Sequence, residues 1–227
     1  MKPLPLRCIT QDIMRCQAQE AYTGHLTSIR VGIDQVACRF PKRFTAVFKT
    51  DRTSFPTLED ADYAEHCFID GAALWQDVGV SVRFVSSSSE MEEDHTFWLA
   101  YRDLPSWPSK DPTRPTLASA FIPHREFLER TVFVYAQGLS PYSRRFMTKV
   151  MAHEFGHILG LRHEFAEEEL ETSLLVGRPN PSSIMNYHPN FSIMDVTEND
   201  IKGAQSFYEL EGIVDGWEVV IVEPNYI

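Results

Sequence analysis

The stretch HEFGHILGLRH, residues 153–163, contains histidines at positions 153, 157 and 163 and a glycine, Gly160, between the second and the third. Residues four apart on an α-helix lie on one face, a single turn apart, so His153 and His157 are predicted to point their imidazoles the same way. Gly160 can take the left-handed backbone conformation that ends a helix. The chain can then turn back and bring His163 beside the other two. The stretch therefore predicts a helix, a sharp turn and a cluster of three imidazoles.

Three clustered imidazoles suit a catalytic metal ion. Neutral imidazole is a good ligand for zinc, and three protein ligands leave a fourth position open for water and substrate. Glu154 is offset from direct ligation but close enough to accept a proton from a zinc-activated water. The sequence therefore predicts one catalytic Zn²⁺ on His153, His157 and His163, with Glu154 as general base.

The longer pattern HExxHxxGxxH resembles the signature of the metzincin zinc peptidases. That family also has a methionine-containing turn beneath the metal, and SIMNY at residues 183–187 is similar to it. The resemblance implies that Met185 forms the apolar floor under the three histidines. It also implies a zincin-like α+β fold, with a twisted mixed β-sheet, an active-site helix and a C-terminal helical subdomain.

Two further residues are similar to the astacin branch of the metzincins. Glu164 directly follows His163, and Tyr187 lies two residues after Met185. In astacins the corresponding tyrosine can bind zinc and swing away to stabilise the transition state, which implies a catalytic role for Tyr187; a buried structural tyrosine is the alternative. The chain departs from the astacin disulfide pattern, because it has no cysteine beyond Cys67. We therefore interpret the resemblance as a divergent, astacin-like metzincin.

The rest of the sequence predicts several short strands and three helices. Runs rich in β-branched and aromatic residues predict strands at 44–49, 80–85, 96–102, 117–122, 131–135 and 217–222. Apolar residues three to four apart predict helices over 58–78 and about 142–161. A third helix is predicted over about 198–210, with Thr197 as its cap and Asp200 completing a capping box. This order indicates an α+β protein with a twisted mixed sheet packed on helices.

Residues 41–227 are predicted to form the catalytic domain, preceded by an N-terminal segment, residues 1–40, of uncertain role. The four cysteines, at positions 8, 16, 38 and 67, lack the CxxC spacing of a structural zinc site. They can be buried thiols or form one or two disulfides, and without a visible signal peptide we favour thiols.

Composition excludes several classes of partner. A net charge of -11 repels nucleic acid and anionic membrane surfaces, so neither is expected to bind. The sequence contains no run of about 18 apolar residues, so it predicts no membrane-spanning helix. The first ten residues lack the apolar core of a secretory signal. We expect either a cytoplasmic protein or a secreted one whose signal has been removed; composition defines no oligomeric state.

These features lead to a prediction of function with two alternatives. The main prediction is a zinc-dependent endopeptidase that hydrolyses peptide bonds in a peptide or protein substrate. The resemblance implies that the substrate backbone binds an edge strand near residues 120–121 and 132–133. One alternative is a zinc hydrolase dedicated to one specialised peptide or small molecule. The other is a non-catalytic zinc-binding module, which the retained Glu154 disfavours.

Overall fold

A five-stranded mixed sheet forms the centre of the computed structural model. The structure describes residues 29–84, 96–104, 116–124, 130–165, 172–177, 180–188 and 191–222. The strands are β3 (Thr45–Thr50), β4 (Ser81–Phe84), β5 (Phe97–Arg102), β6 (Ala118–Ser119) and β7 (Thr131–Tyr135), in the spatial order β4-β3-β5-β7-β6. All neighbours in this sheet are parallel except β6, which runs antiparallel to β7. The predicted fold class, an α+β protein with a mixed sheet, is confirmed.

The predicted strand over 117–122 is shorter than expected. Its paired part, β6, covers two residues, although the carbonyl of Leu117 still accepts a bond from the amide of Tyr135. Pro123 has no amide hydrogen to donate and restricts the backbone of the residue before it, so pairing cannot continue regularly through it. β6 consequently forms a short edge to the sheet.

Helix α2 (Leu58–Ala73) begins where the sequence predicts but ends earlier. Thr57 caps it by accepting a hydrogen bond from the amide of Asp60. The predicted helix over 58–78 breaks after Ala73, and a separate 3₁₀ turn, η1 (Gln76–Val78), ends on Gly79 with φ of 88°. The left-handed Gly79 ends η1 at the predicted last residue, 78, whereas α2 itself passes into tighter i→i+3 turns after Ala73.

Helix α3 (Met147–Ile158) carries the histidine stretch and is also shorter than the predicted 142–161. Residues 143–146 form a 3₁₀ turn, η2 (Ser143–Phe146), and Phe146 has φ of −124° and ψ of 0°, so the α-helix starts only after it. At the other end Gly160 has φ of +95°, which confirms the predicted left-handed turn. The helix therefore spans little more than the segment that positions His153 and His157.

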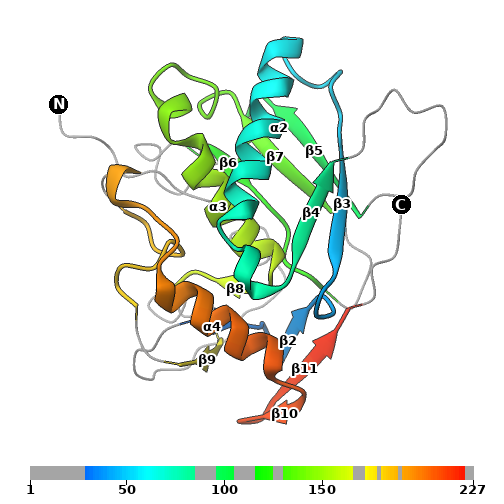
Figure 1. Ribbon diagram of the computed structural model, residues 1–227, viewed down its shortest axis with the longest axis vertical. Coiled ribbons are helices and arrows are strands. Elements are labelled where there is room, and N and C mark those ends of the chain that lie inside the picture. Colours follow the sequence, from blue (N-terminus) through cyan, green and yellow to red (C-terminus); the bar gives the residue numbers. More distant parts are fainter. Residues whose placement is uncertain are drawn as a thin grey trace.

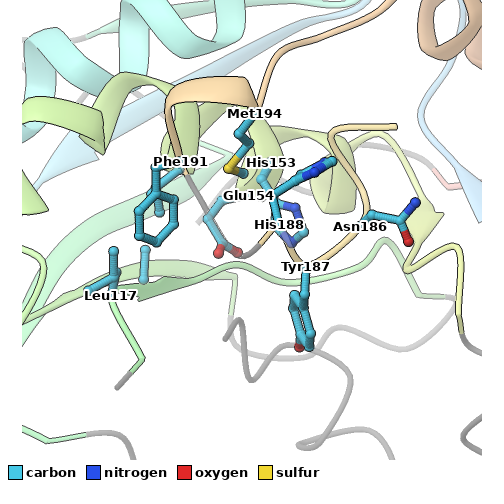
Figure 2. A pocket seen from close by; sticks show the side chains of 10 residues that line it. Leu117, His153, Glu154, Asn186, Tyr187, His188, Phe191 and Met194 are labelled. Atoms are coloured by element: carbon cyan, nitrogen blue, oxygen red, sulfur yellow. The ribbon is translucent and has the colours of Figure 1, made fainter. Parts of the chain in front are cut away.

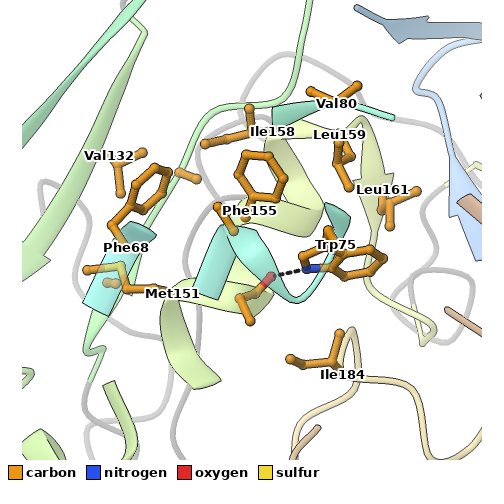
Figure 3. Close-up of a cluster of buried hydrophobic side chains, with 14 of the residues drawn as sticks. Phe68, Trp75, Val80, Val132, Met151, Phe155, Ile158, Leu159, Leu161 and Ile184 are labelled. Atoms are coloured by element: carbon orange, nitrogen blue, oxygen red, sulfur yellow. Dashed lines mark hydrogen bonds between the residues drawn. The ribbon is translucent and has the colours of Figure 1, made fainter. Parts of the chain in front are cut away.

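The core lies between α2, α3 and the large sheet (Figures 1 and 3). Phe68 packs edge-on against Phe155 of α3, with ring centroids 6.1 Å apart. Trp75 is fully buried, and its indole Nε1 donates a 2.8 Å hydrogen bond to the carbonyl of Ala152, as Figure 3 shows. A Cβ at Gly71 would lie 2.7 Å from the amide nitrogen of Ala152, so the backbones of α2 and α3 lie very close together at this point. This packing fixes α3 rigidly just before His153.

Helix α4 (Glu198–Glu209) has the capping box expected from the sequence. The Thr197 hydroxyl accepts from the amide of Asp200, and the Asp200 carboxylate accepts from the amide of Thr197. The same carboxylate also accepts from the hydroxyl of Ser183 at 2.5 Å and from the amide of Ile184 at 3.3 Å. The start of α4 is thereby tied to the turn that contains Met185.

Two small sheets include strands that the sequence did not predict. One has the order β8-β1-β9, from β1 (Ile29–Val31), β8 (Leu161–Arg162) and β9 (Leu174–Val176). The other has the order β10-β11-β2, from β2 (Val36–Arg39), β10 (Gly212–Val214) and β11 (Trp217–Ile221). Residues 29–39 thus pair with segments far along the chain, whereas residues 1–28 lie outside the described part. The boundary at residue 40 stays a prediction.

Other expectations concern cysteines and membranes. Cys38 and Cys67 are both buried, Cys67 as a free thiol whose pKa is raised by burial. Cys8 and Cys16 lie outside the described residues. No helix in the described part of the chain is both long enough and apolar enough to span a membrane.

Candidate active site

The three predicted ligand residues lie together and are buried. One nitrogen from each of His153, His157 and His163 lies within 4.8 Å of the others. The Nε2 atoms of His153 and His163 are 3.2 Å apart. Two nitrogens on a tetrahedral zinc ion, each about 2.0–2.1 Å from the metal, lie roughly 3.3 Å apart. The His153–His163 pair therefore has the nitrogen spacing of a zinc site, and His157 lies close enough to complete the cluster.

Backbone carbonyls fix the tautomers of the two helical histidines. The Nδ1 of His153 lies 2.7 Å from the carbonyl of Ile184, and the Nδ1 of His157 lies 2.8 Å from that of Leu161. A carbonyl oxygen only accepts, so each Nδ1 carries the hydrogen and each Nε2 is left with a lone pair. Such outer hydrogen bonds are the usual support of metal-binding imidazoles.

The same two imidazoles are held in the neutral form. Burial lowers the pKa of His153 to about 4 and lowers that of His157 well below its usual range. The Nε2 of His157 is buried and has no hydrogen-bond partner among the described residues. A buried polar atom without a partner is costly, and a metal ion would satisfy it. The donor set, the tautomers and this atom all fit zinc.

The turn at residues 183–187 lies directly beneath α3. Met185 is fully buried, and a Cβ at Gly156 would lie 2.4 Å from its sulfur atom. The amide of Glu164, the residue after His163, donates to the carbonyl of Met185 at 3.3 Å. The methionine side chain therefore packs against α3 at Gly156, between the two helical histidines; its role as a floor under a metal ion stays a prediction.

Glu154 lies beside His153 in the wall of a pocket that contains about 350 Å³ of empty space, including space open to solvent. Figure 2 shows both side chains among those lining it. Glu154 is 1% exposed, so its carboxylate is reached through this pocket. The predicted general base is thus next to the imidazole cluster and at the end of a route for substrate.

The pocket wall is mainly apolar and comes from three separate segments. Its apolar members are Leu117, Ala118, Val150, Phe191 and Met194. The sequence analysis did not single out Val150, although Val150 precedes Glu154 by four residues and so shares its helix face.

Tyr187 lies beside the third imidazole. Its ring centroid is 4.8 Å from that of His163 and 4.5 Å from that of Phe165. Phe165 also stacks on His163, with centroids 4.8 Å apart and planes 19° apart. In Figure 2 the Tyr187 side chain extends away from Glu154. The structure therefore brings all five predicted site residues into one region; their chemical roles stay predictions.

Two other polar residues, His188 and Glu164, lie at the site. His188 lines the pocket, and its Nε2 lies 2.8 Å from the carbonyl of Ser183. Glu164 has one buried carboxylate oxygen without a hydrogen-bond partner in the described residues. Burial, reinforced by the charge of Asp200, raises the pKa of Glu164 to about 8.

Comparison with known proteins agrees with the fold and the histidine cluster. The model of the peptidase family described as matrixin matches residues 48–209. This match, on a fold that places three imidazoles together, defines a metzincin-type metallopeptidase. The chain belongs to the matrixin family. Matrixins depend on zinc, and the three histidines are positioned for a metal ion.

Among solved structures, one titled "Structure of myroilysin" is similar at a TM-score of 0.52 and 12% sequence identity, over 76% of this chain and 96% of that one. A second, titled "GM1 bound form of the ECX AB5 holotoxin", has a TM-score of 0.47 and 15% identity, over 82% of this chain and 90% of that one. A search of curated protein sequences found no match. At these identities the similarity to myroilysin supports the fold alone.

Proposed function

We propose that the chain is a zinc endopeptidase in which His153, His157 and His163 hold the metal and Glu154 is the general base. The observation that carries the proposal is the convergence of three buried imidazoles beside a carboxylate that lines a pocket. Zinc, when bound, supplies a Lewis acid that polarises the scissile carbonyl and lowers the pKa of a water molecule. The remaining steps of the reaction are carried out by side chains of the protein itself.

Glu154 would accept the proton of the attacking water at its carboxylate and deliver it to the nitrogen of the leaving amine. Its burial favours this role, because proton transfer inside a site that excludes bulk water is not lost to solvent. The position of Glu154 next to His153 in sequence keeps the carboxylate close to the cluster without making it a ligand. Peptide hydrolysis then needs no other acid or base.

The substrate backbone would bind along β6. This strand is at the end of the sheet order, and Ala118 of β6 also lines the pocket. An extended peptide can add to such an edge by backbone hydrogen bonds, with alternate side chains entering pockets. The apolar wall formed with Phe191 and Met194 would then select an apolar side chain next to the scissile bond.

The test is cleavage of a diverse peptide mixture by protein of measured zinc content, followed by mass spectrometry. We expect cuts next to apolar residues, which stop when a chelator removes the metal and return when zinc is added. Stoichiometric zinc without any cut peptide would favour a hydrolase dedicated to one substrate or a non-catalytic module. Absence of zinc from the purified, zinc-supplemented protein would contradict the metal site itself.

Tyr187 is proposed to stabilise the developing oxyanion, as its similarity to the astacin tyrosine implies. Its ring packs on that of His163, one of the three proposed ligands, which keeps the side chain beside the site. We expect Tyr187→Phe to lower kcat by about 10²-fold, because removing one oxyanion donor costs about that much, with little change in KM. Steady-state kinetics measures the split.

The matched control for Tyr187→Phe is Tyr142→Phe, which removes the hydroxyl of a tyrosine that is 48% exposed on another segment. It should leave both kinetic constants unchanged. If Tyr187→Phe also leaves kcat unchanged, Tyr187 is a packing residue against Phe165 and His163 rather than a catalytic one.

A further inference from the structure

The second and third metal-binding histidines both depend on the position of β8. The carbonyl of Leu161, in β8, holds the Nδ1 of His157, and His163 follows the strand directly. β8 is only two residues long, and within the described residues its strand partner is β1. A two-residue strand has little stability of its own. What holds β1 in place therefore also holds these two imidazoles.

Arg30 of β1 makes the contacts that connect this strand to the third ligand. Its Nε donates a 2.9 Å hydrogen bond to the carbonyl of Glu164, the residue after His163. Its Nη1 donates, also at 2.9 Å, to the hydroxyl of Ser173, the residue before β9. Arg30 is 1% exposed, and both bonds are at least partly buried. A planar guanidinium with several donors can hold both groups in one fixed geometry.

Contacts that do not involve Arg30 also hold β1 in place. Ile29 packs so closely on α4 that a Cβ at Gly203 would lie 2.5 Å from its side chain. The side chain of Arg162, in β8, donates to the carbonyl of Gly32 just beyond β1, at 3.0 Å. β1 is therefore held by contacts with α4, β8 and β9. Through its bonds to the segment around His163, it limits the movement of that segment.

We propose that Arg30 is a positioning residue for the metal site, which fixes His163 through the backbone of Glu164 and so raises the affinity for zinc. Arg30 and the rest of β1 precede residues 48–209, the part of the chain that the matrixin model matches. The site is thus completed by a segment outside the family match. The inference rests on the proposed zinc site, and zinc binding by the unaltered protein tests that site separately.

A purely structural role for Arg30 predicts a different result. Loss of a buried arginine would then lower stability without changing how the folded protein binds metal. Arg39 offers a matched control, because it is also 1% exposed and lies on β2, the next strand along the chain, which belongs to a different sheet. Its guanidinium donates to the carbonyls of Phe40 and Leu210, neither of which adjoins a ligand.

The experiment compares Arg30→Met, Arg30→Lys and Arg39→Met by competition with a chromophoric chelator for zinc and by the visible spectrum of the Co²⁺ form. Loss of an outer partner of a metal ligand typically weakens metal binding by 10–100-fold. We expect Arg30→Met to raise the zinc Kd at least about 10-fold and to alter the Co²⁺ spectrum. Arg30→Lys should recover part of the affinity, and Arg39→Met should bind zinc as the unaltered protein does.

Ser173→Ala keeps the experiment decisive if Arg30→Met does not fold, since it removes only one partner of the guanidinium. Ser173→Ala should raise the zinc Kd, by no more than Arg30→Lys does, and leave the fold intact. The proposal is overturned if the Arg30 variants that fold, together with Ser173→Ala, bind zinc with unchanged Kd and spectrum. Failure of the unaltered protein to bind zinc would instead contradict the proposed function.

Discussion

Glu154→Gln is expected to reduce kcat/KM by about 10²–10⁴-fold, because that is the usual contribution of a positioned general base. The reduction corresponds to about 2.7–5.5 kcal/mol of transition-state stabilisation. Glutamine has nearly the shape of glutamate but cannot accept the proton of the attacking water. Zinc content should be unchanged, since the three imidazoles are untouched. Initial rates on a peptide identified from the mixture give the ratio, and metal analysis of the same samples verifies occupancy.

Stability should not fall in Glu154→Gln, because the change removes a carboxylate that is 1% exposed and therefore costly to keep ionised. Glu65→Gln is the matched control: Glu65 is also buried, and its Oε1 lies 2.6 Å from Nη1 of Arg52. Breaking that pair should lower the midpoint of thermal unfolding and leave turnover intact. A Glu154→Gln protein that keeps more than about a tenth of the original kcat/KM would show that another group is the base.

Gly160→Ala is expected to destabilise the fold by more than about 4 kcal/mol, a size that only a named structural conflict produces. Gly160 has φ of +95°, which a residue with a Cβ rarely adopts. A Cβ there would also lie 2.4 Å from the carbonyl oxygen of Cys38. That oxygen belongs to β2, which pairs with β11, so it cannot simply move aside. Urea unfolding in the presence of a chelator measures the loss independently of bound zinc.

Gly79→Ala separates the two causes of that loss. Gly79 also has a left-handed backbone, with φ of +88°, but a Cβ there would meet no atom within 4 Å. The backbone strain alone should cost about 1–2 kcal/mol. Equal destabilisation by the two substitutions would mean that the contact with Cys38 is easily relieved. A Gly160→Ala protein that is folded at low temperature should still bind zinc more weakly, because the turn positions His163.

The positioning role proposed for Arg30 and the strain at Gly160 concern the same segment. Gly160 turns the chain out of α3, β8 follows, and His163 comes next. One side of this segment meets β2 through Cys38, and β8 pairs with β1. The third proposed ligand therefore follows a segment that contacts strands early in the chain, whereas the first two proposed ligands lie on one helix.

Local features of the site could be predicted from the sequence, and the reason is the periodicity of the helix. His153 and His157 share a face because they are four residues apart, and the turn at Gly160 follows from the freedom of glycine. The capping box of Thr197 and Asp200 was equally local. Each of these patterns is complete within a dozen residues, so no knowledge of distant partners was needed.

The structure decided the features that depend on contacts between distant segments. β1 and β2 are three and four residues long, too short to show a periodic pattern, and their partners lie more than 100 residues away. For the same reason the sequence did not indicate that Asp200 also binds Ser183 of the methionine turn. Propensity and spacing predicted the helix, the candidate ligands and the candidate base. Only tertiary packing, which brings β1, β6 and α4 around that helix, decided how the third histidine is held and which side chains form the pocket.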